Sequence, residues 1–223
     1  MATGLLITLE GIEGSGKSTQ AALLHGALSR ARIPVSLTRE PGGSPLAEQV
    51  RDLILRAGEE PLAPAAELLL FLAARAQHVA RTIRPALDRG EVVVCDRFTD
   101  ATVAYQGGGR TIAEPILTSL NDWATGGIKP ARTYLLDVPV ELGLERAKRR
   151  TGDTPDRFER ESREFFEAVR ARYLEVARRE PERIVVLRGT ETQDVLAHHI
   201  WSDVQRILSG RAPNVSRETG HES

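Results

Sequence analysis

Residues 11–18, Gly-Ile-Glu-Gly-Ser-Gly-Lys-Ser, match the pattern G-x-x-x-x-G-K-[ST], and this motif limits the possible folds more than any other part of the chain. An apolar run at 5–10 predicts a strand directly before it, and the spacing at 18–31 predicts a helix after it. Backbone N–H groups of such a loop surround phosphate, and the helix N-terminus adds partial positive charge. We therefore predict a nucleoside triphosphate site formed by the loop: Gly11, Ile12, Glu13, Gly14, Ser15, Gly16, Lys17, Ser18 and Thr19.

Short β-type runs alternate with helical stretches along the rest of the chain. Strands are predicted at 5–10, 34–38, 91–96, 133–138 and 183–188, and helices at 18–31, 64–90, 158–180 and 194–208. Ser44 followed by Pro45 is typical of a helix start, and the apolar Leu68, Leu69, Leu72 and Val79 predict heavy burial of the long helix. This order predicts an α/β P-loop NTPase fold, with a five-stranded parallel sheet flanked by helices on both faces. We expect one domain over 1–208, with a lid insertion at about 146–158, and a disordered tail over 209–223.

Charge and composition exclude several classes of protein. Lys and Arg total 30 and Asp and Glu total 31, so the net charge of -1 argues against bulk electrostatic binding of nucleic acid. The single cysteine, Cys95, has no partner for an internal disulfide, which fits a reducing compartment. The N-terminal residues lack the features of a signal peptide, and no apolar run approaches the ~20 residues that span a bilayer. We therefore expect a cytoplasmic protein without membrane or nucleic-acid partners.

Three kinds of P-loop protein compete at this stage. A GTPase switch should carry N-K-x-D and D-x-x-G, and neither pattern occurs in the chain. A motor-type ATPase needs an acidic pair after its apolar third strand, where this chain has Cys95-Asp96-Arg97. A small-molecule kinase needs a second, positively charged acceptor pocket, so the evidence for that pocket decides between the classes.

Polar side chains suited to an acceptor pocket follow the predicted strands and one helix. Asp96 and Arg97 lie at the carboxyl end of the third strand, where ligands bind in open α/β sheets; Asp96 could hold Mg²⁺ and Arg97 could bind phosphate, or the two could form a structural ion pair. Phe71 and Arg75 are four residues apart on one helix face, as an aromatic that stacks on a base and a cation that meets its phosphate would be, although a phenylalanine in this setting is more often a core residue than a ligand contact. Arg39 follows the second strand and could reach the same edge, or it could belong to a solvated turn.

Three stretches in order, LEGIEGSGKST, TREPGG and FTDATVAYQGGGR, resemble the bacterial thymidylate kinases, and the resemblance extends from Leu5 to Leu208. It implies transfer of phosphate from ATP to dTMP with Mg²⁺, as a step of dTTP synthesis, by a homodimeric enzyme. Ser18 and Asp96 would serve the metal. The resemblance implies a dTMP site made by eight side chains: Glu13, Arg39, Phe71, Arg75, Arg97, Thr102, Tyr105 and Gln106.

The same resemblance assigns roles to several of these residues. Phe71 would stack on thymine, Arg75 and Arg97 would bind the acceptor phosphate, and Glu13 would meet the 3′-hydroxyl of the acceptor sugar. Thr102 and Gln106 would lie near the base, and Tyr105 would pack against the sugar, which favours deoxyribose. Many members of the family have serine where this chain has Ala101, so a hydroxyl contact from that position is absent.

A catalytic arginine is expected beside Lys17 and Arg97, and the resemblance implies that it comes from the lid. In one form of the family the P-loop supplies this arginine, but the position after Glu13 is Gly14 here. The candidates in the lid are Arg149, Arg150 and Arg157, and the sequence does not rank them.

Two other functions compete with dTMP phosphorylation. A related kinase could phosphorylate another nucleoside or nucleotide, and a nucleotide-binding regulator could have lost catalysis altogether. The presence of Lys17, Ser18, Asp96 and Arg97 argues against the regulator.

Overall fold

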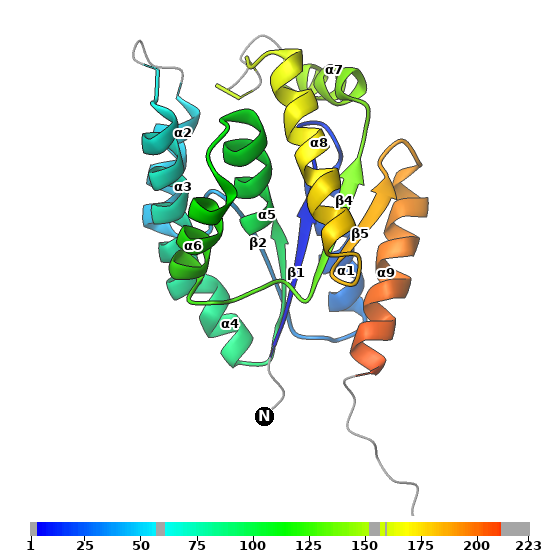
Figure 1. Ribbon diagram of the computed structural model, residues 1–223. Coiled ribbons are helices and arrows are strands. Elements are labelled where there is room, and N and C mark those ends of the chain that lie inside the picture. Colours follow the sequence, from blue (N-terminus) through cyan, green and yellow to red (C-terminus); the bar gives the residue numbers. More distant parts are fainter. Residues whose placement is uncertain (1–3, 57–60, 152–156, 159, 211–223) are drawn as a thin grey trace, which may run out of the picture.

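Five parallel strands form the centre of the molecule in this computed structural model, which describes residues 4–56, 61–151, 157–158 and 160–210 (Figure 1). The strands are β1 (Leu5–Glu10), β2 (Val35–Arg39), β3 (Val92–Asp96), β4 (Arg132–Asp137) and β5 (Ile184–Arg188). Their order in the sheet is β2-β3-β1-β4-β5, and every neighbouring pair is parallel. The predicted five-stranded parallel sheet is confirmed. Because β1 lies between β3 and β4, the chain order reverses beside it, and ligands of such sheets bind at this point.

Helices connect the strands and cover both faces of the sheet. They are α1 (Lys17–Arg30), α2 (Pro45–Leu55), α3 (Pro64–His78), α4 (Arg84–Asp88), α5 (Thr99–Thr102), α6 (Glu114–Thr125), α7 (Val140–Thr151), α8 (Arg163–Arg179) and α9 (Gln193–Ser209). Two π-helical segments, η1 (Val79–Ile83) and η2 (Val103–Gly109), continue α3 and α5. The predicted N-cap of α2 is confirmed, because the hydroxyl of Ser44 accepts a hydrogen bond from the backbone N–H of Ala47.

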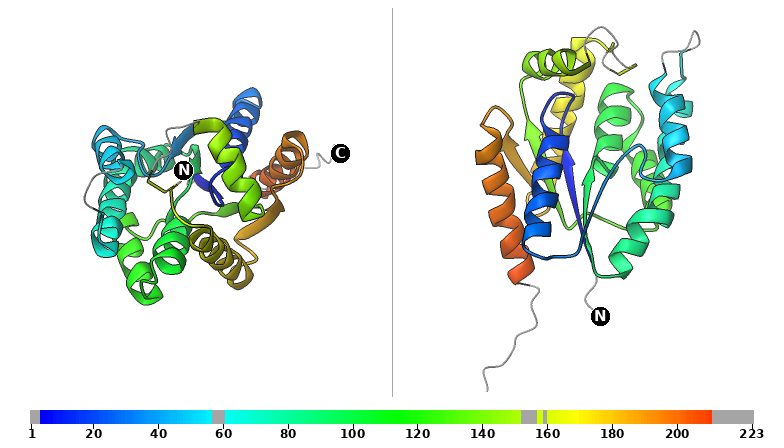
Figure 2. Two further views of the ribbon diagram at one scale, coloured as in Figure 1. Left: turned by 90° about the horizontal axis from the view of Figure 1, so that it is seen from above. Right: turned by 180° about the vertical axis from the view of Figure 1, so that it is seen from behind.

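The two faces of the sheet have separate apolar cores. Alternate residues of β1, Leu5, Ile7 and Leu9, pack beneath α1 and α9, which lie in front when the molecule is seen from behind (Figure 2). On the opposite face, Leu6 and Val93 pack against η1 and α4, and Leu135 packs under α8 and η2. Strands buried on both faces are expected to be apolar throughout, which explains the continuous β-branched run at β3.

The predicted long helix at 64–90 is divided in the structure. The π-helical segment η1 falls between α3 and α4, and it ends two residues before Pro85. Proline has no N–H to donate to the preceding turn and its ring crowds that carbonyl, so the helical hydrogen-bond pattern shifts here. The predicted burial of Leu68, Leu72 and Val79 is confirmed, but Leu69 is 60% exposed because it lies on the outer face of α3.

The lid and tail are only partly covered by the described residues. Helix α7 lies across the carboxyl ends of the strands (Figure 1) and reaches Thr151, so the first part of the predicted lid is helical. Residues 152–156 of the predicted lid and residues 211–223 of the predicted tail lie outside the described residues. In the part of the chain that the structure describes, no helix has both the length and the apolar character needed to cross a membrane.

Candidate active site

The phosphate loop connects β1 to α1 and takes its shape from three glycines. Gly11, Gly14 and Gly16 have φ values of 140°, 68° and 97°, a region that only glycine enters readily. The Lys17 ammonium group donates to the carbonyl of Ile12 at 2.7 Å and to the Ser15 hydroxyl at 3.2 Å, so it lies over the loop. Burial and the nearby charge of Arg97 together lower the pKa of Lys17 to about 8. Lys17 is therefore a cation held against the loop, and a bound phosphate would offset the repulsion between Lys17 and Arg97.

The two predicted metal ligands lie together at the start of α1. The Ser18 hydroxyl donates to the Asp96 carboxylate at 2.5 Å, although 78 residues separate them in the sequence. Hydroxyl and carboxylate oxygens are ligands that Mg²⁺ prefers, and Mg²⁺ is usually bound by one or two such groups together with substrate phosphates. No group of three or more metal-ligating side chains occurs among the described residues. The pair fits the partial protein shell of a nucleotide-bound Mg²⁺. Thr19, the last residue of the predicted loop, lies on the exposed side of α1.

Glu13 belongs to the loop, and its carboxylate joins a group of polar side chains. Its carboxylate accepts a hydrogen bond from Arg97 at 2.8 Å and another from the Tyr105 hydroxyl at 2.6 Å. Arg97 has a φ of 72°, a left-handed conformation that is uncommon for a non-glycine residue and often found at functional sites. The Arg97 guanidinium also lies 4.8 Å from the centre of the Tyr105 ring. The Glu13 carboxylate is therefore held beside Arg97 and Tyr105.

Glu10 and Tyr173 support Arg97 from below. Arg97 donates to the Tyr173 hydroxyl at 3.3 Å, and that hydroxyl donates to the fully buried Glu10 at 2.7 Å. Burial raises the pKa of Glu10 to about 7, and the charge of Asp100 raises it as well. Neither Glu10 nor Tyr173 was identified from the sequence, because Glu10 reads as the end of a strand and Tyr173 as a core residue of α8.

One cavity adjoins the phosphate loop, and all eight side chains predicted to bind the acceptor line it. They come from the loop, from the end of β2, from α3, and from the segment after β3. Lys17, Ser18 and Asp96 line the same cavity, so the predicted metal ligands and the predicted acceptor residues share one space. Arg51 and Phe158 also line it and were missed by the sequence interpretation. Arg51 belongs to no motif in the sequence, and only the tertiary structure brings it to the cavity.

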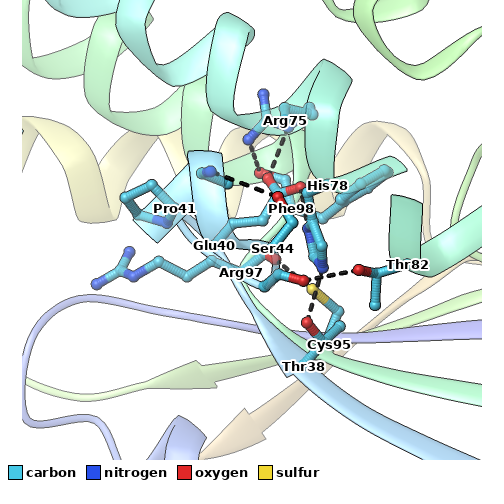
Figure 3. A network of polar contacts seen from close by, with 12 residues as sticks. Thr38, Glu40, Pro41, Ser44, Arg75, His78, Thr82, Cys95, Arg97 and Phe98 are labelled. Carbon is cyan, nitrogen blue, oxygen red and sulfur yellow. Dashed lines mark hydrogen bonds and ion pairs between the residues drawn. The ribbon is translucent and has the colours of Figure 1, made fainter. Parts of the chain in front are cut away.

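Arg75 is the most constrained side chain of this cavity (Figure 3). It is 2% exposed and donates to Glu40 at 2.7 Å, to Thr102 at 2.7 Å and to the carbonyl of Phe98 at 2.8 Å. A fourth hydrogen bond reaches Asn121 at 2.6 Å. Burial alone would raise the pKa of Glu40, but the charge of Arg75 lowers it, so Glu40 is a carboxylate that neutralises Arg75. Arg75 is thereby fixed beside Thr102.

Aromatic side chains form one wall of the cavity. The Phe71 ring lies 5.9 Å from that of Phe158, which lies 5.8 Å from the ring of Tyr105. Phe71 is only partly buried and lines the cavity, so it has a surface that a flat ligand could cover. Gln106 is 1% exposed and donates to Glu67 at 2.8 Å. Arg39 lies at the rim, where it pairs with Glu48 at 2.9 Å.

The three candidate lid arginines differ in their surroundings. Arg149 points to solvent, with 77% of its side chain exposed and a surface pair to Glu145. The backbone of Arg150 belongs to the last turn of α7, and its side chain lies outside the described residues. Arg157 forms an ion pair with the buried Glu67 at 2.7 Å and donates to the carbonyl of Ile54 at 2.9 Å. In this structure Arg157 therefore attaches the end of the predicted lid to α2 and α3.

Comparisons with known proteins show the family of this chain. The family model described as thymidylate kinase matches residues 9–200. A thymidylate kinase of Pseudomonas syringae pv. syringae (strain B728a) is 54% identical over 213 residues, which cover 96% of this chain and 97% of the relative. One from Syntrophotalea carbinolica is 48% identical over 207 residues, covering 91% and 96%. The crystal structure of thymidylate kinase from Ehrlichia chaffeensis superposes with a TM-score of 0.71 at 33% identity, covering 92% of this chain and 99% of that one. This chain belongs to the thymidylate kinase family.

Proposed function

We propose that this protein transfers the γ-phosphoryl group of ATP to the 5′-phosphate of dTMP, giving ADP and dTDP. The observation that carries the proposal is the single cavity in which the Lys17 loop and the Ser18–Asp96 pair face aromatic and cationic side chains. An oxygen of the dTMP phosphate attacks the γ-phosphorus as the bond to the β-phosphate oxygen breaks. That oxygen is already anionic near neutral pH, because the second pKa of a phosphate monoester is about 6, so no general base is needed.

The main difficulty of this reaction is the repulsion between two polyanions. Lys17 would contact the β- and γ-phosphates, and Ser18 and Asp96 would hold Mg²⁺, which would neutralise part of the phosphate charge. On the acceptor side, Arg97 and Arg51 line the cavity and Arg39 lies at its rim. Positioning and charge stabilisation of this kind account for most catalysis of phosphoryl transfer.

Arg75 belongs with the base in this proposal, in contrast to the phosphate-binding role expected from the sequence. Its charge is already matched by Glu40, and it is hydrogen-bonded to Thr102, which is expected to contact the base. A phosphate would have to compete with a buried carboxylate for this arginine, whereas a neutral carbonyl of the base would not. We therefore assign Arg75, Thr102 and Gln106 to the base, with Phe71 stacking on it.

Glu13 and Tyr105 belong with the acceptor sugar. The Glu13 carboxylate can accept a hydrogen bond from the 3′-hydroxyl, and Tyr105 is fixed beside it by their shared hydrogen bond. A carboxylate beside the triphosphate would repel it, so its orientation toward Arg97 supports this assignment.

The last turn of α7 is the source of the lid arginine in this proposal. Arg157 is engaged by Glu67, so Arg149 and Arg150 remain as candidates. The exposed pair between Arg149 and Glu145 contributes little to stability, so it would not oppose movement of Arg149 to the phosphates. Single Arg149→Ala and Arg150→Ala variants separate the two, because the catalytic one should lose on the order of 10³ in kcat.

The protein would act as a cytoplasmic homodimer. Apolar side chains are exposed on the neighbouring helices α2, α3 and α6: Leu46, Leu53, Leu69, Ile116 and Trp123. Trp123 is 82% exposed, and a large exposed apolar group on a flat helical face is typical of an interface. Sedimentation of wild type and Trp123→Asp tests this: a wild-type dimer that the variant weakens supports it, and a wild-type monomer refutes it.

Two experiments test the function. In an assay of ADP release with ATP and Mg²⁺, dTMP should exceed dUMP, dCMP, UMP and thymidine as acceptor. A preference for thymidine would identify a nucleoside kinase instead, and absence of turnover with every acceptor would favour a non-catalytic regulator. The Arg97→Ala variant should lose on the order of 10³ in kcat, and near wild-type turnover would show that Arg97 does not face the transferred group.

A further inference from the structure

Glu67 is a fully buried carboxylate outside the machinery described so far. It lies on α3, and its side chain has no solvent exposure. Gln106 donates to it at 2.8 Å, Arg110 at 3.1 Å, and Arg157 forms an ion pair with it at 2.7 Å. Burial would raise the pKa of Glu67, but the hydrogen bonds from Arg110 and Gln106 outweigh burial and lower it. Glu67 is therefore ionised, so both of its oxygens accept hydrogen bonds and neither donates one.

The ionised state of Glu67 determines how the Gln106 amide is oriented. An amide group has an oxygen and a nitrogen of similar size, and either could in principle face a polar neighbour. A carboxylate can only accept, so the nitrogen Nε2 must face Glu67, as it does here. The oxygen Oε1 is then directed to the other side of the amide. Gln106 lines the cavity, so the group it can offer a ligand there is a hydrogen-bond acceptor.

We propose that Glu67 is a positioning residue for base selection, which fixes Gln106 so that the cavity presents an acceptor to N3 of the pyrimidine. This inference rests on the proposed function, because it requires the base to lie beside Gln106. Thymine and uracil carry a hydrogen on N3 and can donate to Oε1. Cytosine has a lone pair on N3, so two acceptors would face each other and neither would be satisfied.

The two arginines keep this arrangement from reversing. If Glu67 were protonated it could donate a hydrogen bond, and the amide could turn over to present Nε2 to the cavity. Arg110 is itself held by Glu161 and lies 4.7 Å from the centre of the Phe165 ring, so its position is fixed. Arg157 belongs to the end of the predicted lid, so the Glu67 carboxylate that orients Gln106 also holds this segment through an ion pair.

The test compares Glu67→Gln with Glu161→Gln. Both variants replace a carboxylate partner of Arg110 by an amide, but only Glu67 touches Gln106. A glutamine at position 67 can offer either its oxygen or its nitrogen, so it no longer fixes Gln106. We expect the ratio of kcat/KM for dTMP over dCMP to fall roughly tenfold to a hundredfold in Glu67→Gln, through KM for the acceptor. The ratio of kcat/KM for dTMP over dUMP should stay within about twofold of its wild-type value, because both bases carry the N3 hydrogen. Glu161→Gln should keep both ratios.

A second variant keeps the inference testable if Glu67→Gln does not fold. The exchange Glu67→Gln with Gln106→Glu keeps one amide and one carboxylate in contact, and it again presents only an acceptor to the cavity. This double variant should restore preference for dTMP over dCMP. An unchanged ratio in Glu67→Gln, or an exchange variant that stays unselective, would overturn the role of Glu67. If wild type prefers dTMP to dCMP but the variants do not change this preference as expected, only the role of Glu67 is wrong. If wild type does not phosphorylate dTMP, the proposed function itself is wrong.

Discussion

Replacing the buried Glu10 by glutamine should change how stability depends on pH. Glu10 ends β1, where it accepts hydrogen bonds from the backbone N–H of Phe98 and from the Tyr173 hydroxyl, both at 2.7 Å. Glutamine has nearly the same shape, and its oxygen can still accept from Phe98 while its nitrogen donates to the Tyr173 oxygen. The Glu10→Gln variant therefore removes the titration while it keeps the packing.

The magnitude follows from the pKa of Glu10. Burial raises this pKa from its ordinary 4.5 to about 7, with the charge of Asp100 adding to the effect. Between these two values the folded state holds a proton that the unfolded chain has released, so the folded state binds more protons and stability falls as pH rises. One pKa unit corresponds to about 1.4 kcal/mol, so from about pH 5 to about pH 8 this group should remove about 2.5 kcal/mol from the free energy of unfolding.

The assay is denaturant unfolding of wild type and Glu10→Gln across that pH range. Other groups titrate equally in both proteins, so their effect cancels in the difference. The stability of the variant relative to wild type should rise by about 2.5 kcal/mol between about pH 5 and about pH 8. Glu48→Gln is the control: the hydrogen bonds and charges around Glu48 lower its pKa, so it is ionised in both states across the range and its difference should stay flat. A flat or falling difference for Glu10→Gln would refute the reasoning.

Three further predictions concern the site. A Cβ on Gly143 of α7 would lie 2.7 Å from the Glu13 carbonyl oxygen, so Gly143→Ala should displace the phosphate loop and raise KM for both substrates. Gly26→Ala in α1 is the control, because its Cβ would meet only the end of the Arg30 side chain at 3.4 Å. Alanine favours a helix over glycine by ~1 kcal/mol, so Gly26→Ala should raise the melting temperature with unchanged kinetics. Equal kinetics of the two glycine variants would contradict the close contact between α7 and the phosphate loop. Glu13→Gln should weaken dTMP binding far more than ATP binding in calorimetric titrations, and equal effects would count against its acceptor-facing role. Tyr173→Phe removes the hydroxyl between Arg97 and Glu10, so it should cost about 1–3 kcal/mol in thermal unfolding and raise KM for dTMP but not for ATP; an unchanged KM for dTMP would show that Arg97 needs no such support.

Much of the fold could be predicted because its signals are local. Each strand was found within one or two residues, since buried parallel strands are short, continuous apolar runs. The phosphate loop was found because its glycines, lysine and serine act within eight consecutive residues. The π-helical segment before Pro85 was missed, although the proline that shifts the hydrogen-bond pattern is visible in the sequence. The exposure of Leu69 was missed because it depends on how α3 packs against its neighbours.

The candidate site divides in the same way. The residue types of the acceptor pocket followed from motifs, and all eight line one cavity. The partners of these residues did not follow from motifs. Glu67 and Gln106 are 39 residues apart, and Arg97 and Tyr173 are 76 residues apart, so no local sequence pattern predicts that either pair is in contact. Arg157 looked like a catalytic candidate for the same reason, because its buried partner on α3 could not be seen from the lid sequence.

By itself, the sequence determined the strand–loop–helix unit that cradles phosphate and the set of side chains available to a second substrate. Those properties arise from contacts between residues close in the chain, where glycine conformations and apolar periodicity act directly. Only the tertiary structure decided which way each polar side chain points. Arg75 is matched by Glu40, Glu13 faces Arg97, and Gln106 is oriented by Glu67, and each of these follows from burial. A buried polar group must be satisfied by whatever the fold brings beside it, so its orientation is a property of the packed molecule.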